Sequence, residues 1–448
     1  MELEGFGRMA GAKGAMPQKN EVAVVVGVGR SGLALLSHLR SRGVITFAYD
    51  KSEAGREALL AEGLGEVPLL TGEDYRRLPS ADFVFRSPGV RPDHPVIRYL
   101  QGKGARLCDE ITYFAALCPA SIVAVTGSDG KSTTASLIAA AIQMAGKKAF
   151  LGGNIGRSLL WDLPLMQRGD YAVLELSSFQ LMTADLSAIS GVITNLAPNH
   201  LNWHTDMAEY KGAKERLFSL ASRMTVKDGV FPAYRATRFS LDKKTELFLQ
   251  DGVVYDREEP LFHTSEVSLV GRFHLENLMA AAGATRGVVP RELFSALARE
   301  FRGLPHRLSF VARRRGIDFY NSSIDTSPER TVATLTALAE RGISPVVLLG
   351  GAEKGLSFAP LPPALRKMAR GAVLFGGARE AIAKALDKGG FPYTLCADME
   401  EAIFKAINMA EGGAVLLSPA CTAFDAFRDY AERGEVFTQI VLRLSDDN

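Results

Sequence analysis

Short apolar runs alternate with longer amphipathic stretches along almost the whole chain. In the first quarter, the strand-like runs cover residues 21–28, 45–50 and 81–89. The same pattern continues to the carboxy terminus, with runs at 121–127, 171–178, 191–200, 317–323, 345–351, 371–377 and 413–420. Buried strands joined by helical crossovers form mostly parallel sheets. The pattern therefore predicts an α/β protein.

Two turn-rich segments divide this pattern into three parts. One follows the sequence LCDE near residue 110, and the other is FRGLPHR near residue 304, where a glycine and a proline interrupt a helical pattern. At roughly 150 residues per domain, the length also favours three domains. We expect a flexible tail and three domains, with the boundaries 1–20, 21–109, 110–303 and 304–448.

Composition narrows the class of protein. Of the 448 residues, 47% are apolar and 23% are charged, with a net charge of +2, so no overall basic field favours nucleic acid. No apolar run approaches the ~20 residues of a membrane span, and the first 20 residues lack the apolar core of a secretory signal. The four cysteines form no C-x-x-C pair or disulfide framework, which favours a reducing, cytoplasmic compartment.

A glycine-rich loop follows the first predicted strand. Its sequence, Gly27-Val-Gly29-Arg30-Ser31-Gly32, opens a helical pattern, and Asp50 ends the next strand 18 residues after Gly32. Glycines allow a diphosphate to approach the backbone, and a helix amino terminus favours negative charge. The loop alone is compatible with a nicotinamide or flavin cofactor, with another diphosphate nucleotide, or with a tight turn that binds nothing.

A second loop, TGSDGKSTT, follows the strand that starts at residue 121. Gly127 and Gly130 free backbone N–H groups to face phosphate, Lys131 supplies positive charge, and Ser132 or Thr133 offers a hydroxyl to Mg²⁺. The usual G-x-x-x-x-G-K-[ST] pattern requires glycine where Val125 stands, on the strand side of the loop. The alternative is an incidental turn, but ATP or GTP binding explains more of the residues. Two phosphate loops argue against a simple dehydrogenase and suggest ATP plus a substrate that is itself a nucleotide diphosphate.

Four further residues could carry chemistry. Glu175 ends a buried strand, where parallel sheets collect ligands, and its carboxylate suits Mg²⁺; the alternative is a capped or ion-paired core glutamate. His200 lies in the polar segment NLAPNHLNWH and is either a metal ligand, a proton carrier or a structural histidine. Lys211 and Lys214 follow on a predicted helix and, on residue type alone, are ordinary solvated lysines.

Taken together and in this order, the motifs resemble those of the Mur ligases over residues 21–442. The motifs that carry the resemblance are GVGRSG, SPGV, TGSDGKSTT, GGNIG, LELSSFQL, NLAPNHLNWH, GLPHRLSFV, DTSPERT and LLSPACTAFDAFRDYAERG. The resemblance implies a Rossmann-like first domain that holds UDP, a central P-loop-type ATPase domain and a Rossmann-like last domain that carries an amino acid.

The resemblance also implies an activity. SPG after the first domain, together with LPHR, is similar to the members that add D-glutamate to UDP-N-acetylmuramoyl-L-alanine, with ATP and Mg²⁺ (two ions expected), through an acyl phosphate. That reaction belongs to peptidoglycan synthesis, and so to cell shape and division. We expect a cytoplasmic monomer that binds small molecules and neither nucleic acid nor membrane.

The resemblance assigns residues by position in this sequence. The catalytic residues would be Lys131, Glu175, His200 and Lys214. Mg²⁺ would be held by Ser132, Glu175, His200 and Lys214, the lysine as a carbamate formed with CO₂. ATP would be bound by Gly127, Ser128, Asp129, Gly130, Lys131, Ser132, Thr133, His274, Asn277 and Arg307. The UDP-sugar would be bound by Gly29, Arg30, Ser31, Asp50, Lys51, Ser87, Gly89, Asn154 and His200. The amino acid would be bound by Thr326, Lys354, Thr422, Ala423 and Tyr430.

Some positions depart from the family pattern. Ser322 and Asn202 stand where aspartate is common, His274 where asparagine is common, and Ala423 where a serine is expected, next to Thr422. These departures concern the nucleotide clamp and the selectivity for the amino acid. The alternatives at this point are a related ligase for another amino acid or for folate, a nicotinamide oxidoreductase, and a non-catalytic relative that binds nucleotide.

Overall fold

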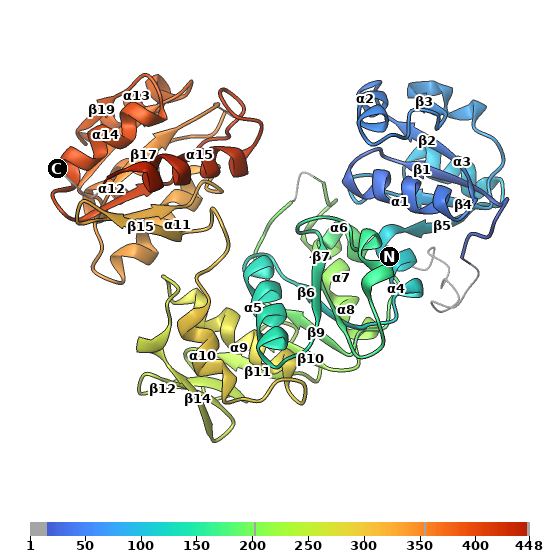
Figure 1. Ribbon diagram of the computed structural model, residues 1–448, viewed down its shortest axis with the longest axis horizontal. Helices are drawn as coiled ribbons and strands as arrows, with labels where there is room; N and C mark the ends of the chain where they lie inside the picture. The colour runs from blue at the N-terminus through green and yellow to red at the C-terminus, as the bar shows by residue number, and fades with distance from the viewer. Residues whose placement is uncertain (1–15, 201–202, 354, 446–448) are drawn as a thin grey trace. The chain divides into compact units, whose positions relative to one another are not determined.

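The computed structural model describes residues 16–200, 203–353 and 355–445 (Figure 1). Most of the predicted tail, Lys354 and Asn202 lie outside the described residues. The chain forms two compact units, one of Met1–His263 with Glu276–Leu297 and one of Thr264–Leu275 with Ala298–Asn448. The units contain three sheets that are mostly parallel, which confirms the predicted α/β class. No helix in the described ranges is long and apolar enough to cross a membrane.

The first sheet is entirely parallel, in the order β3-β2-β1-β4-β5. Alternate residues of β1 pack in different clusters: Val25 lies with α1 and Val24 lies with α3, so both faces of the sheet are covered. The strand order reverses at β1, which opens a crevice between the carboxyl ends of β1 and β4. The strands are β1 Val22–Val26, β2 Ile45–Asp50, β3 Leu69–Thr71, β4 Phe83–Arg86 and β5 Arg106–Asp109, and the helices are α1 Arg30–Ser41, α2 Ala54–Ala61, η1 Gly72–Arg77 and α3 Pro95–Gly102.

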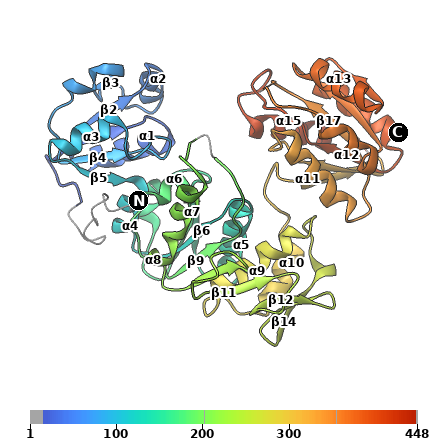
Figure 2. The same cartoon turned by 180° about the vertical axis from the view of Figure 1, so that it is seen from behind.

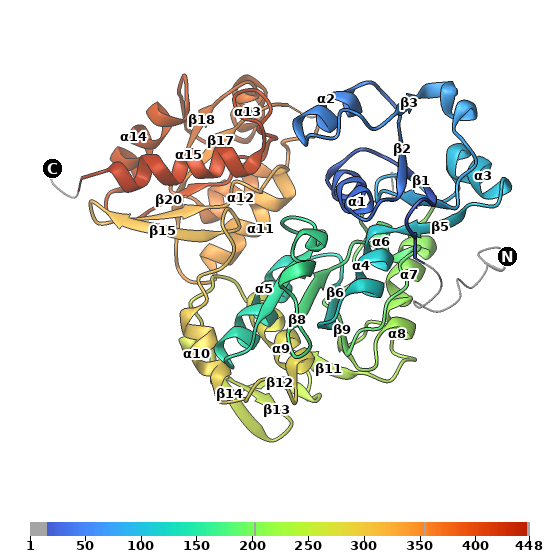
Figure 3. The ribbon, with the colours of Figure 1, turned by 45° about the vertical axis from the view of Figure 1, so that its right-hand side comes forward.

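The central sheet has the order β14-β13-β12-β11-β10-β9-β6-β8-β7. In its parallel part, β6 lies between β9 and β8, and α5 packs beside β6 and β8 (Figure 3). These strands are β6 Ser121–Thr126, β7 Ala149–Gly153, β8 Tyr171–Glu175, β9 Ser190–Ile193, β10 Met224–Lys227, β11 Thr237–Ser240 and β12 Leu247–Gln250. The helices of this region are α4 Glu110–Leu117, α5 Lys131–Met144, η2 Leu159–Trp161, η3 Leu163–Leu165, α6 Ser178–Leu181, α7 Met207–Glu215, α8 Leu217–Leu220, η4 Thr264–Glu266, α9 Phe273–Thr285 and α10 Leu293–Glu300.

An antiparallel extension completes this sheet. Strands β12, β13 (Val253–Asp256) and β14 (Glu259–His263) run antiparallel, with a bulge between Val254 and Tyr255. Asp251 and Gly252 both have positive φ, 49° and 77°, as a two-residue hairpin turn requires. Strand β14 ends the sheet and contains Pro260.

The sheet of the second unit has the order β15-β16-β20-β17-β18-β19, and only β15 runs antiparallel to its neighbour. In β17, Val347 packs with α11, α12 and α13, whereas Val346 packs with α14 and α15 on the other face (Figure 2). The strands are β15 Ser309–Arg314, β16 Ile317–Asn321, β17 Pro345–Gly350, β18 Gly371–Phe375, β19 Tyr393–Leu395 and β20 Ala414–Leu417. The helices are α11 Pro328–Ala339, α12 Leu361–Met368, α13 Arg379–Gly389, α14 Met399–Ala410 and α15 Tyr430–Arg443.

Candidate functional site

A cavity of about 850 Å³ lies at the crevice of the first sheet. The glycine loop borders this cavity. Its first residue, Gly27, has a φ of 97°, and a Cβ at this position would lie 2.8 Å from the Cβ of Ser87, so the conformation of the loop requires glycine there. The Ser87 hydroxyl donates to the Gly27 carbonyl at 2.6 Å, and the Val28 N–H donates to the Asp50 carboxylate at 2.8 Å. These bonds join the loops that follow β1, β2 and β4.

Eight of the nine residues predicted for the UDP-sugar line this cavity: Gly29, Arg30, Ser31, Asp50, Lys51, Ser87, Gly89 and Asn154. His200 is not among its lining residues. The sequence analysis missed Arg91, His94, Arg98, Glu110 and Gln180, which also line it. The three basic residues of this group lie in the segment RPDHPVIR directly after SPGV, so the clustered charge was the signal that could have found them.

The second glycine loop, after β6, is shaped by close packing. Gly127 and Gly130 have φ values of 148° and 76°, and a Cβ on them would lie 1.8 Å from Thr194 Oγ1 and 2.5 Å from Asn277 Oδ1. Asn195 fixes the loop, because its Oδ1 accepts from the backbone N–H groups of Ser128 and Asp129 at 3.1 and 2.9 Å. Helix α5 then begins at Lys131. Asn277, which the resemblance assigned to ATP, lies at this loop, and so do Thr194 and Asn195, which were not predicted.

The position of Val125 explains why the chain lacks the first glycine of the G-x-x-x-x-G-K-[ST] pattern. This residue is fully buried in β6 and pairs with Glu175 on one side and Val192 on the other. The position is part of the sheet core, where an apolar β-branched side chain packs well. The loop itself begins only after Thr126.

Two lysines converge on one carbonyl oxygen of this loop. Lys131 Nζ donates to the Gly127 and Ser128 carbonyls at 3.0 and 2.7 Å, and Lys214 Nζ donates to the Gly127 carbonyl at 2.7 Å. Lys214 is on α7 and only 1% exposed. Burial, and then the charge of Lys131, lower its pKa to about 7. The expectation of a solvated lysine from residue type alone is wrong, because α7 turns this side chain into the interior.

Glu175 ends β8 beside this loop and is 2% exposed. Its Oε1 accepts from the Asn154 amide at 2.8 Å, while the buried Oε2 has no hydrogen-bond partner among the described residues. An unpartnered buried carboxylate oxygen costs about 1–3 kcal/mol, so it indicates a role for a ligand. The oxygen atoms here are of the kind that Mg²⁺ prefers.

His200 is exposed and has a φ of 56°, an unusual backbone conformation for histidine. Its ring centroid lies 4.9 Å from that of Phe179 on α6. In the described part of the chain, no three His, Cys, Asp or Glu side chains are grouped as metal ligands would be. The predicted ligand set also includes a serine and a modified lysine, and Ser132 is buried in the first turn of α5.

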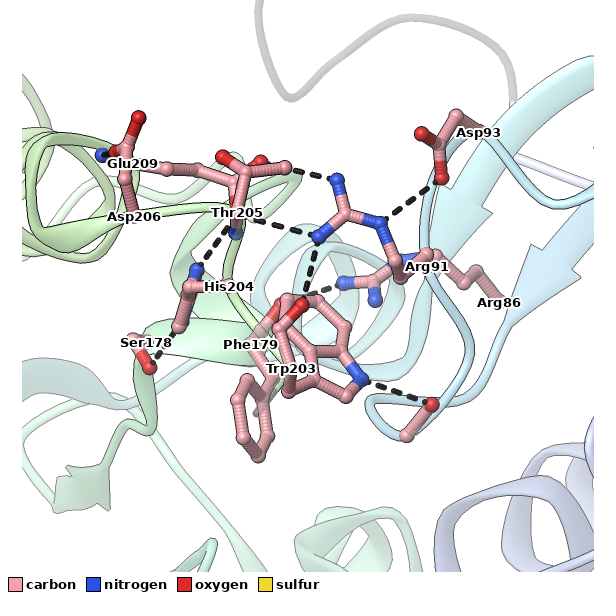
Figure 4. A network of polar contacts seen from close by, with 11 residues as sticks. Arg86, Arg91, Asp93, Ser178, Phe179, Trp203, His204, Thr205, Asp206 and Glu209 are labelled. Carbon is pink, nitrogen blue, oxygen red and sulfur yellow. Dashed lines mark hydrogen bonds and ion pairs between the residues drawn. The ribbon is translucent and has the colours of Figure 1, made fainter. Parts of the chain in front are cut away.

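A polar network joins the loop after β4, which borders the cavity, to α6 and to the segment around His204 (Figure 4). Arg86 is fully buried and donates to the carbonyls of Val90 and Phe179 at 2.6 Å each and to Thr183 Oγ1 at 2.9 Å. Burial lowers the pKa of Arg86 to about 10, so it remains a cation at neutral pH. The loop after β4 is therefore tied to α6.

In the second unit, two of the residues predicted for the amino acid, Thr422 and Ala423, follow β20, and a third, Tyr430, lies at the start of α15. Thr422 Oγ1 donates to the Ala352 carbonyl at 3.0 Å, Ala423 is buried, and Tyr430 begins α15. The fully buried Arg433, which was not predicted, donates to the Thr422 carbonyl at 2.9 Å and to the Ser323 carbonyl at 2.8 Å.

The remaining predicted residues of this unit are Thr326, Arg307 and His274. The N–H of Thr326 donates to the Ile324 carbonyl at 2.8 Å, and that of Arg307 to the Leu304 carbonyl at 3.2 Å. His274 is buried, and burial lowers its pKa to about 3. Asn277, three residues further along α9, is grouped with the first unit. Lys354 lies outside the described residues.

Asp325 is a second buried group of this unit that the motif reading missed. It accepts from the hydroxyls of Thr334 and Ser418 at 2.7 and 2.8 Å. Burial raises its pKa, and the hydroxyls, including that of Ser322, oppose the shift. Ser322, one of the departures, thus contributes to a cage of hydroxyls around a carboxyl group.

Three family models match successive parts of the chain: the Mur ligase MurD-like N-terminal domain at residues 21–109, the Mur ligase middle domain at 125–285, and the Mur ligase glutamate ligase domain at 306–421. The chain is 36% identical to the UDP-N-acetylmuramoylalanine--D-glutamate ligase of Symbiobacterium thermophilum, over 98% of this chain and 100% of that protein. It is 34% identical to the ligase of the same name from Ruminiclostridium cellulolyticum, over 95% and 97%.

Among solved structures, UDP-N-acetylmuramate-alanine ligase of Thermotoga maritima is similar, with a TM-score of 0.62 at 19% identity, over 94% of this chain and 99% of that one. That likeness establishes the shared fold. The full-length sequence identity and the three matching models establish more: this chain is a member of the Mur ligase family.

Proposed function

We propose that this protein is the ligase that joins D-glutamate to UDP-N-acetylmuramoyl-L-alanine, converting ATP to ADP and phosphate, in peptidoglycan precursor synthesis. The observation that carries the proposal is the 36% identity over the whole length of a ligase of that name. The two glycine loops support it, because the reaction needs one diphosphate site and one triphosphate site. A related ligase with another amino acid is the alternative, and the relatives' names do not favour it.

In this proposal, the first sheet is a Rossmann-like domain whose cavity holds the UDP-sugar. A volume of about 850 Å³ lies in the range of small-molecule sites. The helix amino terminus at Arg30 and the basic side chains around the crevice favour a diphosphate. Asn154 lines the cavity and also donates to Glu175, so the sugar end of the substrate would lie toward Glu175.

The loop after β6 is, in this proposal, a P-loop-type site for ATP. Backbone N–H groups at the start of α5 and the ammonium of Lys131 would neutralise charge on the transferred phosphoryl group. The substrate carboxylate attacks the γ-phosphorus, its oxygen forms the new P–O bond, and the bond to ADP breaks. The resulting acyl phosphate has a far better leaving group than a carboxylate.

The residues present fit a Mg²⁺ ion, on the evidence of the unpartnered Glu175 oxygen. Ser132, Glu175, His200 and carbamylated Lys214 would hold it, and the ion would supply charge stabilisation for the phosphates. The lysine carbamate is consistent with the buried amine of Lys214 and its pKa of about 7, because CO₂ adds only to a neutral amine. The nitrogen then loses a proton and becomes part of an anion.

In the second half of the reaction, the neutral amine of D-glutamate attacks the acyl carbon, and the tetrahedral intermediate expels phosphate to leave an amide. We assign binding of D-glutamate to residues of the second unit, namely Thr326, Lys354, Thr422, Ala423 and Tyr430, and assign nucleotide contacts to His274 and Arg307. We further propose that the protein acts as a monomer in the cytoplasm. The four cysteines are free thiols, which is consistent with a reducing compartment.

Product analysis tests the function. ADP and phosphate should appear only when UDP-N-acetylmuramoyl-L-alanine and D-glutamate are both present with Mg²⁺ and ATP. The matched controls are L-glutamate, L-alanine, meso-diaminopimelate and a folate acceptor, each with and without bicarbonate. Turnover with one of these and not with D-glutamate would refute the assigned substrate. A change in absorbance at about 340 nm with added nicotinamide cofactor would indicate an oxidoreductase instead.

A further inference from the structure

Arg91 connects the substrate cavity to the segment that carries His200. Its side chain lines the cavity and also donates to the Trp203 carbonyl at 2.9 Å and to both carboxylate oxygens of Glu209, at 3.0 and 3.2 Å. The guanidinium also lies over the Trp203 ring, 5.1 Å from its centroid. A bidentate hydrogen bond of this kind fixes the orientation of the guanidinium group as well as its distance from the carboxylate. The function proposed above does not use Arg91.

His204 extends the network toward Glu175. Its Nδ1 lies 2.9 Å from a Glu209 oxygen, and its Nε2 lies 2.9 Å from the Ser178 hydroxyl. Because the carboxylate only accepts, Nδ1 carries the proton and donates, and Nε2 accepts from the hydroxyl. His204 and Ser178 are both 2% exposed, and Ser178 follows Glu175 by three residues.

His200 is reached through the backbone of the same segment. The N–H groups of Trp203 and His204 both donate to the His200 carbonyl at 3.0 Å. On its other side, the Trp203 indole donates to the Gly89 carbonyl at 3.1 Å, and Gly89 lines the cavity. The carbonyl of the exposed, left-handed His200 thus accepts from two residues, Trp203 and His204, whose contacts with Arg91 and Glu209 Figure 4 shows.

We propose that Arg91, Glu209 and His204 are positioning residues that place His200 relative to Glu175 and make this placement depend on what fills the cavity. The inference rests on the function proposed above. The geometry supports it because one connected set of contacts touches the cavity loop, the His200 turn and the segment after Glu175, and the bond between His204 and Ser178 at its end is buried. A ligand that presses on residues 87–91 therefore acts on the turn that holds His200.

A double-mutant cycle tests the positioning role. Arg91→Ala should lower kcat about 100-fold, as small displacements of catalytic groups do, with KM for ATP changed less than about twofold. In a His200→Ala background, the same substitution should cost less than about threefold, because the residue it positions is gone. Arg40→Ala, which removes a surface ion pair between α1 and Glu66 in the loop before β3, is the control and should leave kcat unchanged. Additive losses in the two backgrounds would refute the proposal.

Fluorescence gives a readout that does not require turnover. The chain has two tryptophans, so Trp161→Phe leaves Trp203 as the sole indole emitter. UDP-N-acetylmuramoyl-L-alanine should shift the Trp203 emission, and Arg91→Ala should abolish the shift while calorimetry still detects binding. Arg91→Lys keeps the positive charge but loses the bidentate hydrogen bonding, so it should restore the shift in Trp203 emission only in part.

The possible failures are distinguishable. No heat of binding in the Trp161→Phe protein would refute the proposed function and, with it, this inference. Binding with an unchanged Trp203 spectrum would refute the coupling alone. An unaltered shift in Arg91→Ala would show that Arg91 is only a structural residue.

Discussion

At the scale of single residues, the carbonyl of Gly127 is the point where two lysine side chains meet. Lys131 and Lys214 both donate to it, and burial, followed by the charge of Lys131, lowers the pKa of Lys214. Lys131 therefore supplies positive charge at this loop, while Lys214 is held close to its neutral form. Each lysine gives a prediction of its own.

Lys131→Met should abolish ATP-dependent phosphate release, by at least about 100-fold in kcat, because the phosphoryl group loses its nearest cation. Lys131 Nζ donates to two carbonyl groups of its own loop, those of Gly127 and Ser128, and we expect the variant to stay folded. Phosphate release measures the loss, and circular dichroism checks the fold. Lys211→Met, four residues before Glu215 on the same helix as Lys214, is the control and should retain activity.

Removal of CO₂ should lower the rate, and bicarbonate should restore it, if Lys214 works as a carbamate. With a pKa of about 7, the amine is mostly neutral at pH 8 and mostly charged at pH 6, so restoration should be faster at pH 8. Activity after dialysis against CO₂-free buffer measures this. Lys214→Arg should be inactive in both buffers, and a rate that ignores bicarbonate would contradict the carbamate.

The sequence motifs identified candidate residues that lie within the loops and at the strand ends. They did not identify residues of distant segments that contact those loops. Gly127, Lys131 and Glu175 stand at strand ends with recognisable neighbours, so spacing predicted them. Arg91 and Asn195 act through contacts over 112 and 67 residues, and no local pattern encodes such pairs.

At the scale of elements, Glu209 links α7 to the loop after β4. Burial alone would raise its pKa, but hydrogen bonds from Arg91, the Thr205 N–H and His204 outweigh burial and lower the pKa to about 2. A carboxylate with a lowered pKa stabilises the folded state above its unfolded pKa. That contribution is lost as the pH falls toward the folded value.

We therefore expect stability to fall between about pH 5 and pH 2, with Glu209 contributing roughly 2 kcal/mol of it. Glu209→Gln should be less stable than the parent at pH 7 and should lose less on acidification. Urea unfolding at pH 7, 5 and 3 measures both effects. Glu73→Gln, which removes an exposed partner of Arg76, should show neither.

The apolar pattern predicted ten strands of the parallel sheets, because each is an apolar run that is mostly buried: β1, β2, β4, β6, β8, β9, β16, β17, β18 and β20. It did not predict β3, β5, β7, β10, β11 and β19. The pattern predicted strands at 45–50 and 345–351, and the structure has β2 at Ile45–Asp50 and β17 at Pro345–Gly350. The hairpin of β12 to β14 was not predicted. Its strands are short and partly exposed, and burial alternates weakly along them.

At the scale of the whole molecule, the two glycine loops proposed as binding sites lie within one compact unit but on different sheets. If they bind as proposed, each ligand should stabilise the protein by itself, by about 2.7 kcal/mol at 100 times its dissociation constant. Thermal unfolding with Mg-ATP or with UDP-N-acetylmuramoyl-L-alanine measures this.

Lys131→Met should lose the response to Mg-ATP and keep the response to the UDP-sugar. Arg30→Ala, at the first glycine loop, should show the reverse. A variant that loses both responses would indicate general damage and not a separate site.

The end of the nine-stranded sheet has a consequence for how copies of this chain behave in a crowded solution. An edge strand exposes unpaired backbone N–H and C=O groups, to which a strand of another chain can hydrogen-bond. Strand β14 interrupts that row, because Pro260 lacks an N–H and the bulge at Val254 and Tyr255 bends its partner strand. This edge of the sheet is thereby a poor template for the addition of a strand from another copy of the chain.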